Sequence, residues 1–264
     1  MRALFFLFVF FVSFLSFSQK KYSKTLKNID NKKTYYSSIA QDIWSFAEMG
    51  YQEEKSSDLL KKILSEEDFN IESGVAKIPT AFIATYGKGL PIIAILGEYD
   101  ALPGLSQQRV PYKISAGGKA GHACGHHLFG TASAAAAIEI KNYLIENKKS
   151  GTIRFYGCPA EEGGSGKVYM TREGLFDDVD IALHWHAANQ NSASIRPALA
   201  NKSAKFRFYG VSAHAAGAPE KGRSALDAVE AMNAMVNMLR EHVTESTRIH
   251  YVITRGGEAP NVVP

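Results

Sequence analysis

Two stretches near the start of the chain carry apolar residues at helical spacing. Ile39, Ile43 and Phe46 fall on one face of the first stretch, and residues 59–64 contribute four apolar side chains to the second. Gly50 separates the two stretches, and Ser56 and Ser57 precede the second apolar group. The pattern therefore predicts two amphipathic helices that each bury one side.

Strand-like and helix-like segments then alternate as far as residue 183. Residues 80–86 and 92–96 are rich in strand-forming residues, and the glycines at 87 and 89 between them predict a hairpin. Further along the chain the pattern predicts an Ala-rich buried helix at 128–145, a strand at 152–156, a short helix at 168–174 and a strand at 181–183. This alternation predicts an α/β fold, with a mixed sheet flanked by helices.

The pattern starts again after a polar stretch at 189–201. A strand at 204–209, a helix at 224–243 and a strand at 248–254 form a predicted βαβ unit. We therefore expect a first domain over residues 34–200 and the first part of a second domain over 202–264. One βαβ unit has too few strands to cover a core, so we expect both domains to be incomplete in this chain.

Composition agrees with a globular protein. The chain has 264 residues, 45% hydrophobic and 21% charged, which is enough to bury a sizeable core. The formal net charge of +4 owes much to the Lys-rich stretch at 20–33, so nucleic acid is a poor candidate partner.

The first 18 residues have the pattern of a signal peptide. Arg2 precedes an apolar run at 3–15, and Ser16 and Ser18 stand at the −3 and −1 positions before Gln19. The run is shorter than the roughly 20 residues that span a bilayer. We expect export to the periplasm or the medium, with no membrane attachment after cleavage; the alternative is an uncleaved N-terminal anchor.

Possible metal ligands stand just before the Ala-rich helix. The sequence GHACGHH at 121–127 includes Cys124 and His126, and a Cys-x-His pair can direct thiolate and imidazole at one ion. The adjacent helix N-terminus, and any bound cation, would lower the pKa of Cys124. The alternative is a glycine-rich turn with incidental histidines.

Adjacent carboxylates follow the strand at 152–156. Glu161 and Glu162 repel each other unless a cation lies nearby, although a solvated loop is the commoner setting for such a pair. His184 and His186 flank Trp185 after the strand at 181–183, and at a spacing of two both can face one side.

Asp100 follows the strand at 92–96, where it is placed to orient a ligating imidazole. Each of these segments alone is equally consistent with a polar strand end. Several such ends in one predicted sheet favour a metal site.

The same segments resemble a metallopeptidase family that includes aminoacylases, hippurate hydrolases, plant auxin-conjugate hydrolases and bacterial glutamate carboxypeptidases. The similarity is greatest to the branch that contains the aminobenzoyl-glutamate utilisation proteins. The matching segments lie in the family's order at 97–104, 121–130, 159–164, 180–186, 210–217 and 256–264.

The resemblance implies a catalytic domain with two divalent metals, zinc or manganese, and an inserted α+β lid domain that forms a homodimer. It implies hydrolysis of the amide bond of N-acyl or N-aroyl amino acids such as p-aminobenzoyl-glutamate. The implied metal ligands are Cys124, His126, Glu162 and His186. Glu161 is the implied general base and acid, Asp100 the orienting carboxylate, His214 a lid histidine that contacts substrate in the neighbouring subunit, and Asn261 a substrate contact.

Two departures from the family stand out. His127 replaces the Asp or Asn of many relatives, which would alter contacts around the ligands. The family also supplies a further histidine ligand from a segment that would follow Pro264, so we expect this chain alone to lack a complete site.

Several alternatives stay open at this level. A disulfide between Cys124 and Cys158 would fit an exported protein, but it would remove a proposed ligand, so free thiols are favoured. A dipeptidase or general aminoacylase competes within the enzyme class, and a non-catalytic binding or dimerisation module competes outside it. Ligand types alone do not choose the metal.

Overall fold

The computed structural model describes residues 22–193 and 197–264, which fall into two compact units divided between Ser192 and Ala193. The predicted signal peptide lies outside the described residues. Across the described ranges, no helix has both the length and the apolar character that crossing a membrane requires.

Six helices and a short 3₁₀ turn belong to the described part of the first unit. They are α2 (Ser23–Asn31), α3 (Lys33–Phe46), α4 (Glu54–Glu66), α5 (His126–Glu146), α6 (Glu161–Gly164), α7 (Gly166–Arg172) and η1 (Val75–Lys77). The two predicted N-terminal helices are α3 and α4, which bury Ile39, Ile43, Leu60 and Leu64 as the apolar spacing requires. Helix α2 was not expected.

The first unit is built on a five-stranded mixed sheet of order β1-β2-β6-β3-β7. Its strands are β1 (Asn70–Ser73), β2 (Phe82–Lys88), β3 (Ile92–Glu98), β6 (Gly151–Cys158) and β7 (Ile181–Leu183). Strands β6, β3 and β7 run parallel, whereas β1 and β2 are antiparallel to their neighbours. A separate small pair joins β4 (Leu102–Pro103) to β5 (Ala120–Gly121). The predicted α/β class is confirmed.

The hairpin predicted between the strands at 80–86 and 92–96 is wrong. Strand β6 lies between them, with Ile83 paired to Tyr156 on one side and Ile95 paired to Phe155 on the other. Every residue of β6 except Arg154 is buried. A strand this buried needs a hydrogen-bonding neighbour along both edges, so it takes the central place that a hairpin would have closed.

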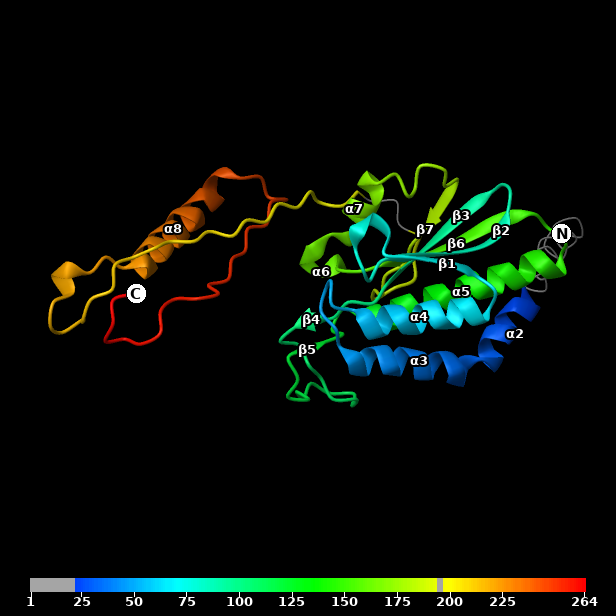
Figure 1. Ribbon diagram of the computed structural model, residues 1–264, viewed down its shortest axis with the longest axis horizontal. Helices are drawn as coiled ribbons and strands as arrows, with labels where there is room; N and C mark the ends of the chain where they lie inside the picture. The colour runs from blue at the N-terminus through cyan, green and yellow to red at the C-terminus, as the bar shows by residue number, and fades with distance from the viewer. Residues whose placement is uncertain (1–21, 194–196) are drawn as a thin grey trace, which may run out of the picture. The chain divides into compact units, whose positions relative to one another are not determined.

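Helices cover one face of the sheet and shorter elements cover the other (Figure 1). Helices α4 and α5 pack on the first face with α3 outside them, and their core includes Phe82, Ile138 and Phe155. The second core joins residues of η1 and α7 to the sheet around Tyr156 and Met170. Both cores leave the carboxyl ends of β3, β6 and β7 free to carry polar side chains.

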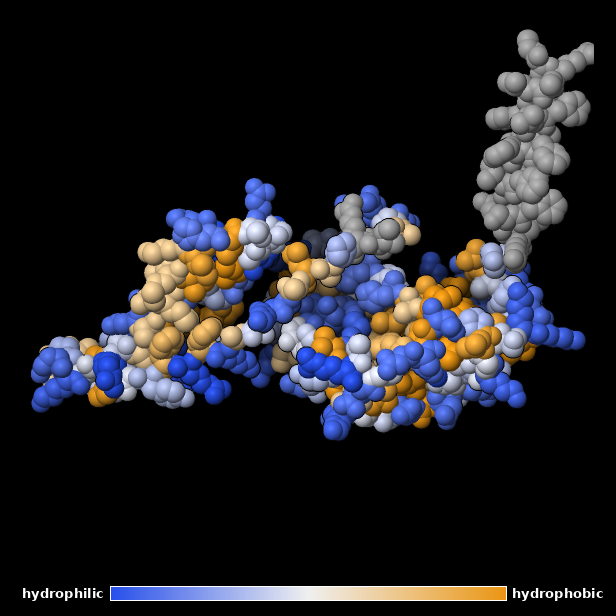
Figure 2. Space-filling view, turned by 90° about the horizontal axis from the view of Figure 1, so that it is seen from above, coloured by the Kyte–Doolittle hydropathy of each residue, from blue (hydrophilic) through white to orange (hydrophobic). Residues whose placement is uncertain are grey.

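The second unit departs from the predicted βαβ pattern. Helix α8 (Ala225–Leu239) forms, begun by the side chain of Ser224 and followed by the turn η3 (Arg240–His242), but neither 204–209 nor 248–254 forms a strand within the described residues. A strand needs a hydrogen-bonded neighbour, and neither segment has one here. Of the described residues of this unit only Asn233 is buried, and apolar side chains such as Met235 and Val252 are exposed. Figure 2 shows hydrophobic residues on the surface of the molecule.

Candidate metal centre

The predicted site residues of the first unit gather where its parallel strands end. Asp100 follows β3, Glu161 follows β6 and His186 follows β7, while Cys124 and His126 stand at the start of α5. Strands β3, β6 and β7 are parallel, so their carboxyl ends share one edge of the sheet. The topology thus brings together five side chains that span 87 sequence positions from Asp100 to His186.

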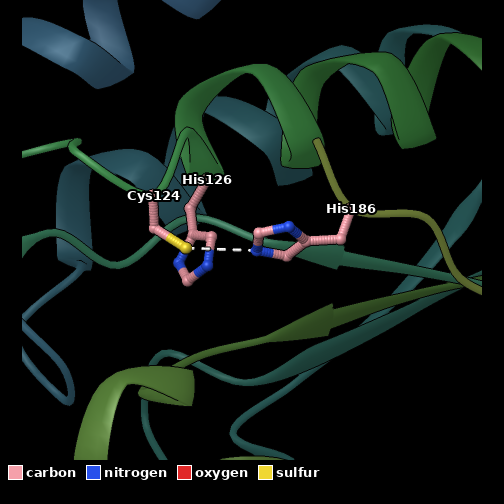
Figure 3. Close-up of side chains that lie close together, drawn as sticks. All are labelled: Cys124, His126 and His186. Atoms are coloured by element: carbon pink, nitrogen blue, oxygen red, sulfur yellow. Dashed lines mark hydrogen bonds between the residues drawn. The ribbon is translucent and has the colours of Figure 1, made fainter. Parts of the chain in front are cut away.

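Cys124, His126 and His186 form the closest group of possible ligands (Figure 3). One ligand atom from each lies within 4.8 Å of the others. The Cys124 Sγ is 3.1 Å from His186 Nε2, and the rings of His126 and His186 stand edge to face with centroids 6.1 Å apart. Figure 3 shows the sulfur and both rings directed toward one point.

The hydrogen bonds of the two imidazoles fix which nitrogen is free to bind metal. His126 Nδ1 lies 2.9 Å from Asp100 Oδ1, and His186 Nδ1 lies 2.9 Å from the Ala187 carbonyl. Both partners are acceptors, so each Nδ1 carries a hydrogen, and a lone pair for metal binding can be offered only at Nε2. These Nε2 atoms lie inside the cluster, with His186 Nε2 beside Cys124 Sγ and His126 Nε2 beside Glu98 Oε2.

Glu98 belongs to this site, although the sequence analysis did not select it. Its side chain is buried, and Oε2 lies 3.2 Å from His126 Nε2. Glu98, His126 and Glu161 form a second group whose ligand atoms lie within 4.8 Å of one another. The signal was available in the sequence, because Glu98 and Asp100 are two residues apart at a strand end and so can face the same side.

Lys167 and His184 share the other oxygen of Glu98. Lys167 Nζ donates to Oε1, and His184 Nε2 lies 3.2 Å from the same atom. Burial by itself raises the pKa of Glu98, but these hydrogen bonds and the Lys167 charge outweigh it and lower the pKa to about 2. Glu98 is therefore an anion at any ordinary pH. His184 lies outside both ligand groups and contacts Glu98 instead.

The contact between Glu98 and His126 tests whether the site suits a cation. Neither Glu98 Oε2 nor His126 Nε2 has a hydrogen-bond partner among the described residues. With Nδ1 protonated toward Asp100, two buried acceptors face each other at 3.2 Å. Such a pair is unfavourable unless a proton or a cation lies between them. A divalent metal held by imidazole, thiolate and carboxylate fits this requirement.

Asp100 connects the two sides of the cluster. Its Oδ1 receives the His126 Nδ1 hydrogen, and its Oδ2 accepts the backbone N–H of Glu162 at 2.8 Å. Asp100 is 1% exposed, so water does not replace either bond. One carboxylate therefore sets both the His126 ring and the backbone that carries Glu162.

Glu161 and Glu162 stand at the open side of the group. The Glu161 Oε2 lies 3.9 Å from His126 Nε2, with its side chain 44% exposed. Partial burial, Glu98 and Glu162 all raise the pKa of Glu161, which favours a group that exchanges protons. Glu162 lies close enough to Cys124 to raise the pKa of its thiol.

The expected low pKa of Cys124 does not hold for the chain without metal. Burial first, and then Glu162, Glu161 and Glu98, raise the pKa of Cys124 to about 11. Burial and the nearby carboxylates both favour the neutral thiol, whereas a bound cation would favour the thiolate. Cys124 and Cys158 are both free, as favoured from the sequence, and burial raises the pKa of Cys158 to about 12.

His127, the residue that departs from the family pattern, packs away from the ligand groups. Its ring lies 5.1 Å from the ring of His122, whose Nε2 lies 3.1 Å from the Ile43 carbonyl. Burial lowers the pKa of both His122 and His127 to about 4. These two rings are therefore neutral supports beneath the start of α5.

The second unit brings His214 and Asn261 together. The backbone N–H of Ala215 donates to the Asn261 carbonyl at 3.1 Å, and His214 forms a β-bridge with Val262. The N–H groups of Ala216 and Gly217 donate to His214 Nδ1, at 3.2 and 3.0 Å. His214 is thereby held in the tautomer that carries its hydrogen on Nε2, as a donor.

The family assignment follows from residues 94–260, which match the model of peptidase family M20/M25/M40. This match covers more than half of the chain and includes every residue of the ligand groups, so the chain belongs to this family.

Two curated relatives indicate the branch. One is a p-aminobenzoyl-glutamate hydrolase polypeptide of Escherichia coli, 50% identical over 232 residues, a match that covers 86% of this chain and 48% of the relative. The other is Xaa-Arg dipeptidase of Mus musculus, 30% identical over 253 residues, which covers 91% of this chain and 55% of the relative. The chain therefore spans about half the length of these relatives.

Solved structures show the same fold. The YXEP protein of Bacillus subtilis, described as a dinuclear metal binding peptidase of the M20 family, is 28% identical with a TM-score of 0.50. The match covers 57% of this chain and 42% of the YXEP chain. An aminobenzoyl-glutamate utilization protein from Klebsiella pneumoniae has a TM-score of 0.54 at 18% identity. The match covers 90% of this chain and 66% of the Klebsiella chain.

Proposed function

We propose that this chain is part of a metal-dependent hydrolase that cleaves the amide bond of N-acyl or N-aroyl amino acids. One observation carries the proposal: the buried His126 Nε2 and Glu98 Oε2 face each other beside Cys124 and His186, a set of donor atoms that a divalent cation would bridge. Glu161 stands next to this group and is exposed enough to meet a substrate.

A divalent metal bound here would polarise the scissile carbonyl and acidify a water molecule. His126 and His186 would hold it through Nε2, with Cys124 and Glu162 as the other proposed ligands. Glu161 accepts the proton from water and then donates it to the leaving amine. Its raised pKa suits both directions of that transfer.

The second unit would contribute substrate contacts. His214 presents an N–H at Nε2 because two backbone N–H groups occupy its Nδ1. Such a donor suits a developing oxyanion. We keep the predictions that His214 contacts substrate in a neighbouring subunit, that Asn261 contacts substrate, and that this unit forms a homodimer.

The relatives supply two candidate substrates. The Escherichia coli relative, at 50% identity, favours p-aminobenzoyl-glutamate, whereas the mouse relative, at 30%, favours a dipeptide ending in arginine. The higher identity places p-aminobenzoyl-glutamate first. Comparing the rates at which one preparation hydrolyses the two compounds decides between them. Cleavage of only the arginine dipeptide would reverse the order.

The decisive experiment measures metal content by mass spectrometry in wild type, Glu162→Ala and the control Glu173→Ala. Glu173 is an exposed carboxylate after α7 that lies outside both ligand groups. We expect one or two metals per chain in wild type and the control, with loss in Glu162→Ala, and the same spectra identify zinc or manganese. If wild type folds but holds no metal, the proposed hydrolase function is refuted and a non-catalytic binding or dimerisation module is favoured.

Export is proposed independently of catalysis. The leader at residues 1–18 predicts a mature protein that begins at Gln19. N-terminal sequencing of protein recovered from the periplasm or the medium tests this, and a retained Met1 would refute cleavage.

A further inference from the structure

The connector between α3 and α4, residues 47–53, contacts the ends of two strands that carry the candidate site. After β3, the Ala101 N–H donates to the Glu48 carbonyl at 2.8 Å, and Met49 forms a parallel β-bridge with Ala101. Ala101 directly follows Asp100. The connector therefore supports the backbone that places the orienting carboxylate.

The same connector holds the loop after β6, residues 159–165, called here the acidic loop because it contains Glu161 and Glu162. The Tyr51 hydroxyl donates to the Gly164 carbonyl at 2.6 Å. Glu53 Oε1 accepts the Ala160 N–H at 2.7 Å, directly before Glu161. These two bonds hold the acidic loop on both sides of its carboxylate pair.

The acidic loop needs such support because its backbone is strained. Ala160 has a φ of 53° and Ser165 a φ of 58°, both in the left-handed region that non-glycine residues avoid. Within the segment assigned to α6, Glu162 has a ψ of 89°, which is not helical. Strained conformations of this kind persist only where surrounding contacts fix them.

Glu53 is the buried centre of these contacts. It is fully buried, and its second oxygen accepts the Thr80 hydroxyl at 3.0 Å. Thr80 is held in turn, because its carbonyl accepts the hydroxyls of Ser57 and Tyr99 at 2.9 and 2.5 Å. Both Glu53 oxygens are thus committed to partners that are themselves fixed, which makes the carboxylate a rigid anchor.

Close packing adds a steric limit to the hydrogen bonds. A Cβ on Gly50 would lie 3.0 Å from the Ala160 Cβ, and one on Gly164 would lie 2.8 Å from the Tyr51 ring. The connector and the acidic loop therefore meet with no room for larger side chains, and Ala160 is itself fully buried. The position of the loop depends directly on the position of the connector.

We propose that Glu53 is a positioning residue for the Glu161-Glu162 pair. Its carboxylate fixes the Ala160 backbone and so sets the distance of both carboxylates from Asp100 and His126. This inference rests on the proposed metal-dependent function, but it assigns a role to a residue outside the ligand groups and on a different part of the chain.

The test compares Glu53→Ala and Glu53→Gln with Glu48→Gln in the full chain. Glu48 is the matched control, because its side chain accepts the N–H groups of Lys55 and Ser56 at the start of α4 and makes no bond to the acidic loop. Glutamine at position 53 keeps an oxygen for the Ala160 N–H. Two quantities are measured: zinc affinity by chelator competition, and amide hydrogen exchange of residues 160–164 in metal-free protein.

We expect Glu53→Ala to bind zinc about tenfold more weakly and to exchange these amides about tenfold faster. Glu53→Gln should recover most of both losses, and Glu48→Gln should lower the melting temperature without changing either. Equal loss in Glu48→Gln, no recovery with glutamine, or unchanged zinc affinity in Glu53→Ala would each overturn the proposal.

Two further outcomes keep the test decisive. If Glu53→Ala does not fold, Tyr51→Phe removes only the bond to Gly164 and should weaken zinc binding about threefold with faster exchange in the loop; wild-type behaviour would overturn the proposal. If wild type binds neither zinc nor manganese, the proposed function fails, and the exchange measurement alone then decides whether Glu53 fixes the loop.

Discussion

Replacing Asp100 with asparagine gives a sharp test of the candidate metal centre. Asp100 accepts two hydrogens, one from His126 Nδ1 at 2.9 Å and one from the Glu162 N–H at 2.8 Å. Asparagine has one acceptor oxygen and one NH₂ group, so it satisfies only one of these donors. The substitution keeps the size of the side chain and removes one interaction whichever way the amide turns.

Each orientation has a predictable cost. With NH₂ toward Glu162, two donors face each other and the acidic loop must move. With NH₂ toward His126, Nδ1 either accepts, which places the hydrogen on Nε2 and removes the lone pair offered to the metal, or keeps its hydrogen on the Asp100 backbone carbonyl alone, at 3.1 Å. Loss of such an orienting partner typically weakens metal binding by about 10- to 100-fold, or about 1.4 to 2.8 kcal/mol.

The assay is competition between metal-free protein and a chromophoric chelator for zinc, with Asp178→Asn as the control. Asp178 forms a bidentate pair with Arg154, at 2.6 and 2.7 Å, and touches no member of the ligand groups. We expect Asp178→Asn to match wild type. A zinc affinity within twofold of wild type in Asp100→Asn would refute the idea that Asp100 orients His126.

Three other substitutions probe stability and ligation. Glu67 bonds the buried amine of Lys141 at 2.8 Å; burial raises its pKa, but two lysines outweigh this and lower the pKa below the ordinary 4.5. Glu67→Gln should therefore cost roughly 1 to 2 kcal/mol in urea unfolding at pH 7, and the difference should vanish as pH falls through the folded pKa; a constant difference would contradict the sign. Gly157→Ala would put a Cβ 2.1 Å from the Phe82 ring, so we expect a loss of about 1 to 3 kcal/mol, and an unchanged unfolding midpoint would show that the ring moves freely. Cys124→Ser should lower zinc content after dialysis, because a hydroxyl does not ligate as a thiolate does, and full retention would exclude Cys124 as a ligand.

Local patterns in the sequence were sufficient for much of the first unit. The apolar spacing of Ile39 and Ile43 produced α3, and β7 ends at Leu183 as predicted. Asp100, Glu161 and His186 were selected because polar residues follow strands that end at one sheet edge, and that edge does bring them together. Such features depend on short stretches of chain, where periodicity and strand polarity are sufficient.

The tertiary structure decided what depends on distant partners. The insertion of β6 between β2 and β3 replaced the hairpin, and the segments at 204–209 and 248–254 found no strand to pair with among the described residues. Glu53 and Glu98 looked like ordinary acidic residues until the fold buried them against Ala160 and His126. The sequence by itself determined most elements of the first unit and the chemical types at their ends. Strand order, and which carboxylates lose water, follow from packing between segments far apart in the chain, which no local pattern encodes.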